Sequence, residues 1–378
     1  MKLVLEKGAL SEGIQIVSKA VPSKTPMDIL KCILVDASGD KIYLIANDTD
    51  LGIQTCVDGK IEERGVIAID AEMFSNIVRK LPDAQVTLTV KGEKVTILCG
   101  GSRFDIMGKD GSDFVYLPDV EKNDGIEISQ YTFREMISRT IFSVSSNESN
   151  KMMTGELLEI HGNTMRLVAL DGHRVSLRKV EMNQFYPDRK VIIPGKTLNE
   201  ISKILSGDMD QKIRIYFASG TVLMEFGETI VVSRLIEGEY FRIDQMLSTE
   251  YGTQIRVNRQ EFLSCIDRAS LLVKEDDKKP IILSIKDDVV EMKINTSMGR
   301  MDETLSIRKK GLDLNIGFNP KFMMDSLRAV SDEEISIYFL SQKAPCFIRN
   351  DIEPEGREEK EEAQSYCYLV LPVNFINF

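Results

Sequence analysis

Two helix patterns recur three times along the chain at nearly the same interval, and this repetition constrains the fold more than any single motif. The first pattern begins at Leu10, Phe133 and Phe262, and each copy places mostly apolar residues at positions i, i+4 and i+7. That spacing follows one face of an α-helix. The three copies start 123 and 129 residues apart.

The second pattern keeps the same order and nearly the same interval. Its copies contain Phe74, Leu198 and Met323, which are 124 and 125 residues apart. Each copy follows a short apolar run and precedes an alternating segment typical of a strand. The alternating segments are 85–90, 212–217 and 334–339. Together the two patterns predict three homologous domains, each close to one third of the 378 residues.

Each repeat predicts a strand, a helix, several strands, a second helix and several more strands. This order indicates an α+β domain in which two helices pack on antiparallel sheet. Polar segments at 123–125 and 248–250 are suitable places for the boundaries, and the first contains an Asp-Gly turn signal. We therefore predict tandem domains at residues 1–123, 124–248 and 249–378.

Composition excludes several classes of protein. The net charge of −11 excludes a uniformly basic nucleic-acid binder, although a local basic surface stays possible. No apolar run approaches the roughly 20 residues of a membrane span, and the charged start does not fit a signal peptide, so we expect a cytoplasmic protein without a membrane partner. None of the six cysteines forms a C-x-x-C pair, and the chain has two histidines. We expect reduced, buried thiols, no metal site and no cofactor.

Basic residues recur at matching helix positions. Lys196 and Lys203 are seven residues apart and share a helix face, and Lys321 and Arg328 lie 125 residues further on. The first repeat has Arg79 at the second position but an acidic residue at the first. One interpretation is an ordinary solvated helix face. The other is a positive surface that binds phosphate backbones without reading sequence.

Two motifs resemble catalytic signatures. Gly195-Lys196-Thr197 opens a predicted helix after a strand, but the glycine that a phosphate-binding loop needs five residues earlier is Lys190. A plain helix start is favoured. Asp171 and His173 could suggest acid–base chemistry, yet no Gly-x-Ser-x-Gly elbow accompanies them. A tight turn with Gly172 at its tip is the favoured interpretation.

The C-terminal region has two further features. Residues 353–364 contain six glutamates and predict a solvated loop before a last strand at 366–370. The chain then ends in several apolar residues, 371–378, which indicate either a docking surface or packing against the last domain.

The segment 170–175, Leu-Asp-Gly-His-Arg-Val, resembles a motif of the bacterial sliding clamp family, the beta subunit of DNA polymerase III. Other landmarks agree in order and spacing over the whole chain. They are Met1-Lys2, Asp28-Ile29-Leu30, Ser102-Arg103-Phe104, Val191 to Pro194, Ser233 to Gly238 and Tyr368 to Val373.

The resemblance implies a head-to-tail dimer that closes a ring around double-stranded DNA, with helices lining the hole. It implies a non-catalytic processivity factor that tethers the DNA polymerase III alpha subunit and other clamp-binding-motif proteins. An ATP-dependent clamp loader would open the ring. Net charge −11 fits an acidic rim around a basic lining.

The resemblance also implies site residues. The partner-peptide groove would contain Met153, Leu170, Gly172, His173, Arg174, Val175, Phe241, Met246, Pro345, Leu369, Leu371 and Pro372. The DNA-facing residues would be Lys24, Arg79, Arg139, Lys196, Lys203, Arg268, Lys321 and Arg328. Subunit contact would join Phe104 to Leu271 and Leu272.

Three positions depart from the family pattern. Leu170 replaces a threonine, Phe241 replaces a proline and Asn374 replaces a terminal arginine. Leu170 predicts a more apolar pocket, and the three changes together leave the shape of the groove and its peptide preference open. Two other functions stay open on the residues alone: a nucleic-acid-binding repeat protein that does not encircle DNA, and a hydrolase that uses Asp171 and His173.

Overall fold

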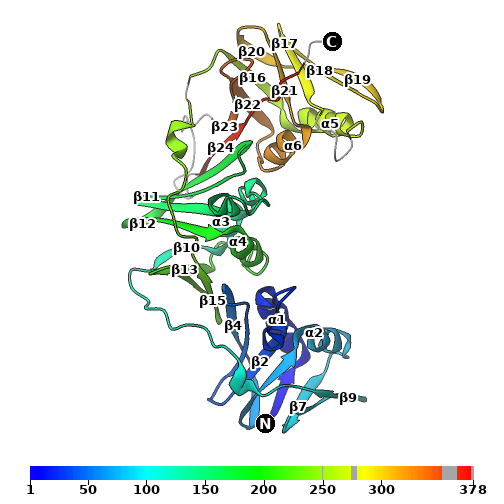
Figure 1. Ribbon diagram of the computed structural model, residues 1–378, viewed down its shortest axis with the longest axis vertical. Coiled ribbons are helices and arrows are strands. Elements are labelled where there is room, and N and C mark those ends of the chain that lie inside the picture. Colours follow the sequence, from blue (N-terminus) through cyan, green and yellow to red (C-terminus); the bar gives the residue numbers. More distant parts are fainter. Residues whose placement is uncertain (249, 274–278, 351–363, 376–378) are drawn as a thin grey trace. The chain divides into compact units, whose positions relative to one another are not determined.

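The computed structural model describes residues 1–248, 250–273, 279–350 and 364–375. The chain forms two compact units (Figure 1). The first comprises Met1–Arg134 with Lys196–Leu235, and the second comprises Glu135–Gly195 with Ile236–Phe378. The units therefore do not coincide with the three sequence repeats, because the second repeat contributes to both.

The first unit contains two antiparallel sheets. One has the order β5-β1-β7-β8-β9, and the other has the order β10-β13-β14-β15-β4-β3-β2-β6. In β7 buried residues alternate with more exposed ones, so this strand turns one face toward the core. The strands are β1 Lys2–Glu6, β2 Cys32–Ala37, β3 Ile42–Asn47, β4 Leu51–Val57, β5 Gly59–Glu63, β6 Gly65–Asp70, β7 Gln85–Lys91, β8 Lys94–Cys99, β9 Ser102–Met107, β10 Ile126–Ser129, β13 Lys212–Ala218, β14 Thr221–Phe226 and β15 Thr229–Arg234.

Helices α1 (Lys7–Val17) and α2 (Ala71–Lys80) lie side by side on these strands (Figure 1). The face of α1 that carries Leu10 and Ile14 is buried, as the repeat pattern predicts. The N-terminus of α2 is capped by Asp70, whose side chain accepts the main-chain N–H of Met73 at 2.9 Å.

Strands from different repeats join directly in the larger sheet. Strand β15 of the second repeat pairs with β4 of the first repeat, with Thr229 opposite Thr55. The hydroxyls of these two threonines are buried and hydrogen-bonded at 2.9 Å. Because the pairing continues the sheet across the sequence boundary, the contacts group strands of two repeats into one compact unit.

The second unit repeats this arrangement with a seven-stranded and a four-stranded sheet, both antiparallel, in the orders β11-β12-β24-β23-β22-β16-β20 and β19-β18-β17-β21. Strand β12 of the second repeat pairs with β24 of the third, so the same type of join recurs. The strands are β11 Gly155–Leu170, β12 Arg174–Pro194, β16 Thr253–Asn258, β17 Ile281–Lys286, β18 Val289–Thr296, β19 Gly299–Ser306, β20 Arg308–Gly311, β21 Leu314–Phe318, β22 Glu334–Phe339, β23 Cys346–Arg349 and β24 Gln364–Val370.

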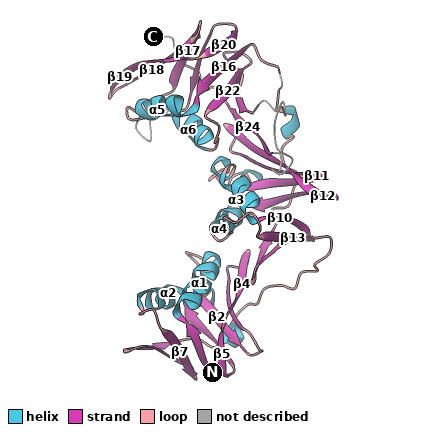
Figure 2. Cartoon of the chain, turned by 180° about the vertical axis from the view of Figure 1, so that it is seen from behind, coloured by secondary structure: helices cyan, strands magenta, loops and turns pink. Residues whose placement is uncertain are grey.

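Helices α5 (Arg259–Ser270) and α6 (Pro320–Arg328) pack against each other in the second unit (Figure 2). Both begin after a capping asparagine, Asn258 and Asn319, whose side chains accept main-chain N–H groups. Two more helices, α3 (Gln130–Ser138) and α4 (Gly195–Ser202), complete the predicted two per repeat.

Several sequence predictions can be compared with these elements. The three alternating segments are strands β7, β13 and β22, and Gly195 begins a helix, so these predictions are confirmed. All six cysteines are free, and four of them are buried. The acidic stretch 353–364 lies outside the described residues except at its last position. In the part of the chain that the structure describes, no helix is long and apolar enough to cross a membrane.

Candidate functional site

The turn between β11 and β12 is built by an aspartate and a glycine. One oxygen of Asp171, Oδ1, accepts the main-chain N–H groups of His173 at 2.9 Å and Arg174 at 3.1 Å. Gly172 has φ 86°, which a residue without a Cβ adopts at little cost. The predicted tight turn is confirmed. The other carboxylate oxygen accepts a hydrogen bond from Arg174, so the turn and Arg174 use both oxygens of Asp171.

The first repeat contains the same turn between β3 and β4. Asp48 Oδ1 accepts the N–H groups of Asp50 and Leu51, and the next residue, Thr49, has φ 79°. Each turn is also bonded by the strand that pairs beside it. The main-chain N–H of Arg234, at the end of β15, donates to the carbonyl of Asp50, and that of Leu371, just after β24, donates to the carbonyl of His173, each at 2.9 Å. The turn is therefore a part of the repeated architecture, and a repeated structural turn argues against a hydrolytic Asp171 and His173 pair.

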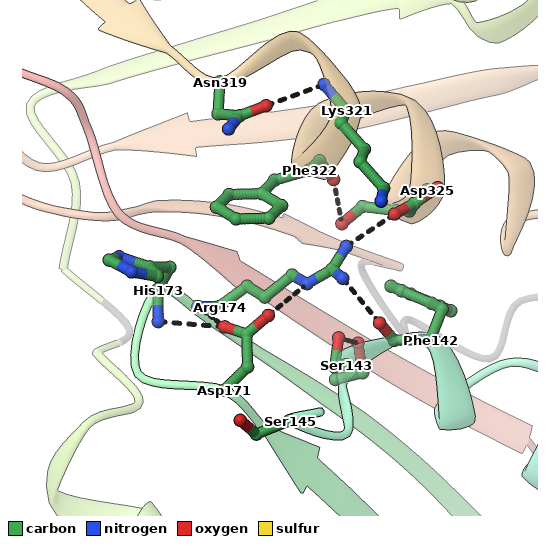
Figure 3. Close-up of polar contacts among 12 residues, drawn as sticks. Phe142, Ser143, Ser145, Asp171, His173, Arg174, Asn319, Lys321, Phe322 and Asp325 are labelled. Atoms are coloured by element: carbon green, nitrogen blue, oxygen red, sulfur yellow. Dashed lines mark hydrogen bonds and ion pairs between the residues drawn. The ribbon is translucent and has the colours of Figure 1, made fainter. Parts of the chain in front are cut away.

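Arg174 is the most heavily bonded residue beside this turn (Figure 3). Its guanidinium donates to Asp171 at 2.9 Å, to Asp325 of α6 at 2.7 Å and to the carbonyl of Phe142 at 2.5 Å. Its side chain is 7% exposed. A buried guanidinium with three oxygen partners holds the turn of the second repeat against the second helix of the third repeat.

Two phenylalanines complete the surroundings of Arg174. The guanidinium carbon lies 4.5 Å from the ring centre of Phe322 and 5.2 Å from that of Phe142. On the same ring of Phe322, His173 stacks at 5.8 Å with a 21° angle between planes. Phe142, Phe322 and Asp325 were not predicted from the sequence. No local signal marks them, because the contacts join segments 32 to 151 residues apart.

Most of the predicted groove residues fall into two groups. One is an apolar junction cluster, defined here as the buried residues around β11, β12 and β24 together with their partly buried neighbours. It contains Met153, Leu170, Val175, Phe241 and Leu369. The other group lies at the turn and the tail: Gly172 and His173 are exposed, and Leu371 N–H donates to His173. Met246 is 40% exposed and Leu371 is 37% exposed, while Pro345 and Pro372 are partly buried.

The described part of the C-terminal tail packs on β21. Val373 N–H donates to the carbonyl of Gly317 at 2.8 Å. A Cβ on Gly317 would lie 2.7 Å from the ring of Phe375, so the absence of a side chain at Gly317 is needed for this approach. Packing against the last domain is therefore correct for Val373 and Phe375, while Leu371 lies beside the turn.

Seven of the eight predicted DNA-facing residues are exposed. Lys24 lies in the loop after α1, Arg79 in the last turn of α2, Lys196 at the start of α4 and Lys203 just after α4. Arg268 lies in the last turn of α5, and Lys321 and Arg328 lie at the two ends of α6. Five of these cations therefore lie on helices and two lie in loops, and their contact with DNA stays a prediction.

Arg139 differs from the other seven. It is partly buried, and its guanidinium donates to the carbonyl of Ala329 at the end of α6, at 2.7 Å. The neighbouring Arg178 donates to the same carbonyl at 2.6 Å and to the hydroxyl of Tyr368 at 3.0 Å. Arg139 also pairs with Glu135. These contacts assign Arg139 a structural task at the C-terminal end of α6, where the helix dipole favours positive charge.

The predicted subunit-contact residues present apolar surface in each unit. Phe104 on β9 is 38% exposed, and Leu271 at the end of α5 is 78% exposed. Leu272 is partly buried and packs against the core of the third repeat. Exposed leucine and phenylalanine at an edge strand and a helix end fit a contact with another subunit.

One buried carboxyl of the second unit was not predicted from the sequence. Glu156 on β11 is fully buried, its Oε1 has no hydrogen-bond partner and its Oε2 lies 2.6 Å from Thr140 Oγ1. Burial raises the pKa of this carboxyl to about 8, because a charge in the core loses its hydration. The sequence offers no signal, since Glu156 stands at an ordinary strand position.

Known proteins match this chain in all three of its consecutive parts. The N-terminal, central and C-terminal domains of the DNA polymerase III beta subunit match residues 1–118, 127–241 and 244–358. A protein named beta sliding clamp from Staphylococcus aureus is 32% identical over 366 residues, which cover 94% of each chain. The crystal structure of the Bacillus subtilis DNA polymerase sliding clamp has a TM-score of 0.92 at 32% identity and covers 100% of both chains.

A crystal structure from Eubacterium rectale, provisionally described as a DNA polymerase III beta subunit, also has a TM-score of 0.92. Its sequence identity is 53%, and the match covers 99% of this chain and 100% of that chain. The fold is therefore a tandem array of three clamp domains, each rich in sheet and carrying helices. The chain belongs to the DNA polymerase III beta subunit family. The domain limits at residues 123 and 248 stay a prediction.

Proposed function

We propose that this chain is a sliding clamp, in which two copies join head to tail into a ring around duplex DNA. Family membership over the whole chain carries the proposal. Exposed Phe104 and Leu271, with partly buried Leu272, would close the ring, and a head-to-tail contact between two subunits leaves none of these edges open. A linked ring stays on DNA without tight contacts, so sliding and retention are compatible.

The DNA-facing residues of this proposal are Lys24, Arg79, Lys196, Lys203, Arg268, Lys321 and Arg328. They are exposed, positively charged and placed on or beside helices, which suits binding to phosphates without base recognition. Arg139 is left out because its guanidinium is bonded inside the second unit.

The partner groove would lie at the turn 171–174 and the adjoining apolar junction cluster. Apolar walls with a few polar anchors suit a short peptide that carries leucine and phenylalanine. The partners would be the polymerase III alpha subunit, the clamp loader and other proteins with a clamp-binding motif. The proposal gives the chain no catalytic residue and a cytoplasmic location.

Retention on DNA tests the central claim. We expect the protein, once loaded by its clamp loader, to stay on closed circular DNA through a high-salt wash and to leave when one restriction cut linearises the circle. A topological link does not depend on counter-ions, whereas a surface contact weakens steeply with salt. Gel filtration of the protein–DNA complex before and after cutting measures this. Loss of the protein from uncut circles in high salt would contradict the ring.

A double variant tests the DNA-facing assignment. Lys196→Ala with Lys203→Ala removes two exposed cations, and we expect weaker binding to a short duplex. The slope of log K against log salt should become shallower by about 1 unit, because fewer counter-ions are released. Fluorescence anisotropy over a range of salt concentrations gives the slope. An unchanged slope would show that these lysines do not contact phosphate.

A further inference from the structure

Most of the cations assigned to DNA contact already have a carboxylate partner within the protein. Lys203 lies 2.5 Å from Glu200, and Arg328 lies 3.2 Å from Asp267. The remaining pairs are Lys196 with Asp48 and Arg268 with Glu303. The pairs occur in both compact units and involve α4, α5 and α6. Because such pairs recur in both units, we interpret them as a shared feature of these helices and not as a chance contact.

In three of these pairs the carboxylate lies deeper than the cation. The side chains of Asp48, Glu200 and Glu303 are 9%, 20% and 27% exposed, whereas those of Lys196, Lys203 and Arg268 are 62%, 44% and 53% exposed. The acid is thus held by the fold, and the basic group reaches outward over it. A hydrogen bond from Arg268 lowers the pKa of Glu303, so this carboxyl stays ionised at neutral pH.

A carboxylate fixed beneath a cation partly cancels the field that a DNA phosphate would meet. DNA binding by basic residues gains its strength from the release of condensed counter-ions, about 0.9 for each phosphate neutralised. A cation that already carries an internal counter-ion contributes less to this release. We propose that Asp48, Glu200 and Glu303 are built-in counter-ions, which keep contact with duplex DNA weak and so permit sliding. The proposal rests on the proposed function, because it concerns the same DNA-facing surface.

Other cations of that surface contrast with these pairs. Within the described residues, no carboxylate lies at ion-pair distance from Lys24, Arg79 or Lys321; Arg79 donates instead to the neutral amide oxygen of Asn76 at 2.8 Å. Among the described residues, the surface therefore combines cations without a carboxylate partner and cations whose field is partly cancelled by one. Stabilisation of the fold would be a weak reason for the pairs, since exposed ion pairs contribute little.

Removal of the counter-ions tests the proposal. The double variant Glu200→Gln with Glu303→Gln keeps side-chain size and leaves Lys203 and Arg268 unpaired. We expect its affinity for a short linear duplex to rise about threefold or more at low salt, with a slope steeper by about 1 to 2 units. The probe is a duplex of mixed sequence, followed by fluorescence anisotropy with the full-length chain. Light scattering should first confirm that the mass equals that of the parent.

A matched control separates the effect of removing carboxylates beside the DNA-facing cations from the effect of a changed net charge. Glu127→Gln with Glu225→Gln changes the net charge by the same amount, at carboxylates paired with Arg214 at 3.1 Å and Lys122 at 2.7 Å on strands β10 and β14. The proposal holds if the Glu200 and Glu303 variant gains clearly more affinity than this control.

Two results would overturn the proposal, and they are distinguishable from each other. Equal affinity of the test and control variants, with weaker binding after Lys196→Ala and Lys203→Ala, would reject the counter-ions and leave the DNA-facing surface intact. If the lysine variant also binds as the parent does, the surface assignment itself fails, and the proposed function loses its DNA contacts.

Discussion

Replacement of Arg174 by alanine is expected to lower the stability of the second compact unit by about 3 kcal/mol and to weaken peptide binding by about tenfold. The loss of stability follows because Asp171 and Asp325, whose side chains are 14% and 20% exposed, would lose their shared cation. The loss of peptide affinity follows because Arg174 fixes Phe322, on which His173 stacks. Urea denaturation and titration with a Leu/Phe-containing peptide measure the two effects.

Arg178 provides the control for this experiment. It lies on the same strand, is 8% exposed and also binds a main-chain carbonyl, that of Ala329, but it has no bond to the turn. Arg178→Ala should therefore reduce stability and leave peptide affinity close to that of the parent. Equal losses of peptide affinity in both variants would mean that general loosening of the unit, and not the position of His173 and Phe322, is responsible.

A lysine at the same position refines the interpretation. Arg174→Lys keeps the charge but removes the planar fork that reaches Asp171, Asp325 and the Phe142 carbonyl together. We expect an intermediate stability and a peptide affinity close to that of alanine, because one ammonium cannot hold both carboxylates and stack on Phe322. Full recovery by lysine would show that charge alone matters.

The sequence predicted the repeated part of this protein well, for a physical reason. Helix faces such as Leu10 and Ile14 repeat because each domain must bury one apolar stripe, and that stripe is visible as local spacing. The tight turn at Gly172 was predictable for a similar reason, since an Asp-Gly pair acts on its own neighbours. Properties that depend on short stretches of chain are therefore recoverable without coordinates.

Properties that depend on contacts between repeats were not recoverable. The division into two compact units results from the pairing of β4 with β15 and of β12 with β24, and neither pairing leaves a local mark. Arg139 illustrates the same limit. Its position in the repeat matches that of Arg268, yet only the fold shows that the guanidinium of Arg139 donates a hydrogen bond to the carbonyl of Ala329. Positions equivalent in sequence need not face the same partner.

Glu156→Gln is expected to stabilise the protein increasingly as the pH rises. The pKa of Glu156 is raised by burial from 4.5 to about 8, so the folded state holds a proton that the unfolded state releases. The stability that this proton provides is complete below the unfolded pKa and is lost as the pH rises through the folded pKa. Relative to the parent, the variant should gain about 3 kcal/mol between about pH 5 and about pH 8.

The hydrogen bonds around Glu156 support the neutral form. Thr140 has one hydroxyl proton, and its oxygen lies 2.8 Å from the carbonyl of Met136 and 2.6 Å from Glu156 Oε2. Donation to the carbonyl leaves the short contact with Glu156 to be explained, and a protonated carboxyl explains it by donating to the hydroxyl oxygen. The amide of glutamine can donate in the same place without a titratable proton.

Glu62→Gln is the matched control for the pH dependence. Hydrogen bonds from Lys2 and Lys60 lower the pKa of this exposed glutamate, so it is ionised in both folded and unfolded protein over the same pH range. Its difference in stability from the parent should stay constant, whereas that of Glu156→Gln should grow with pH. Parallel curves for the two variants in urea denaturation would mean that Glu156 is ionised in the core and that its charge is compensated there.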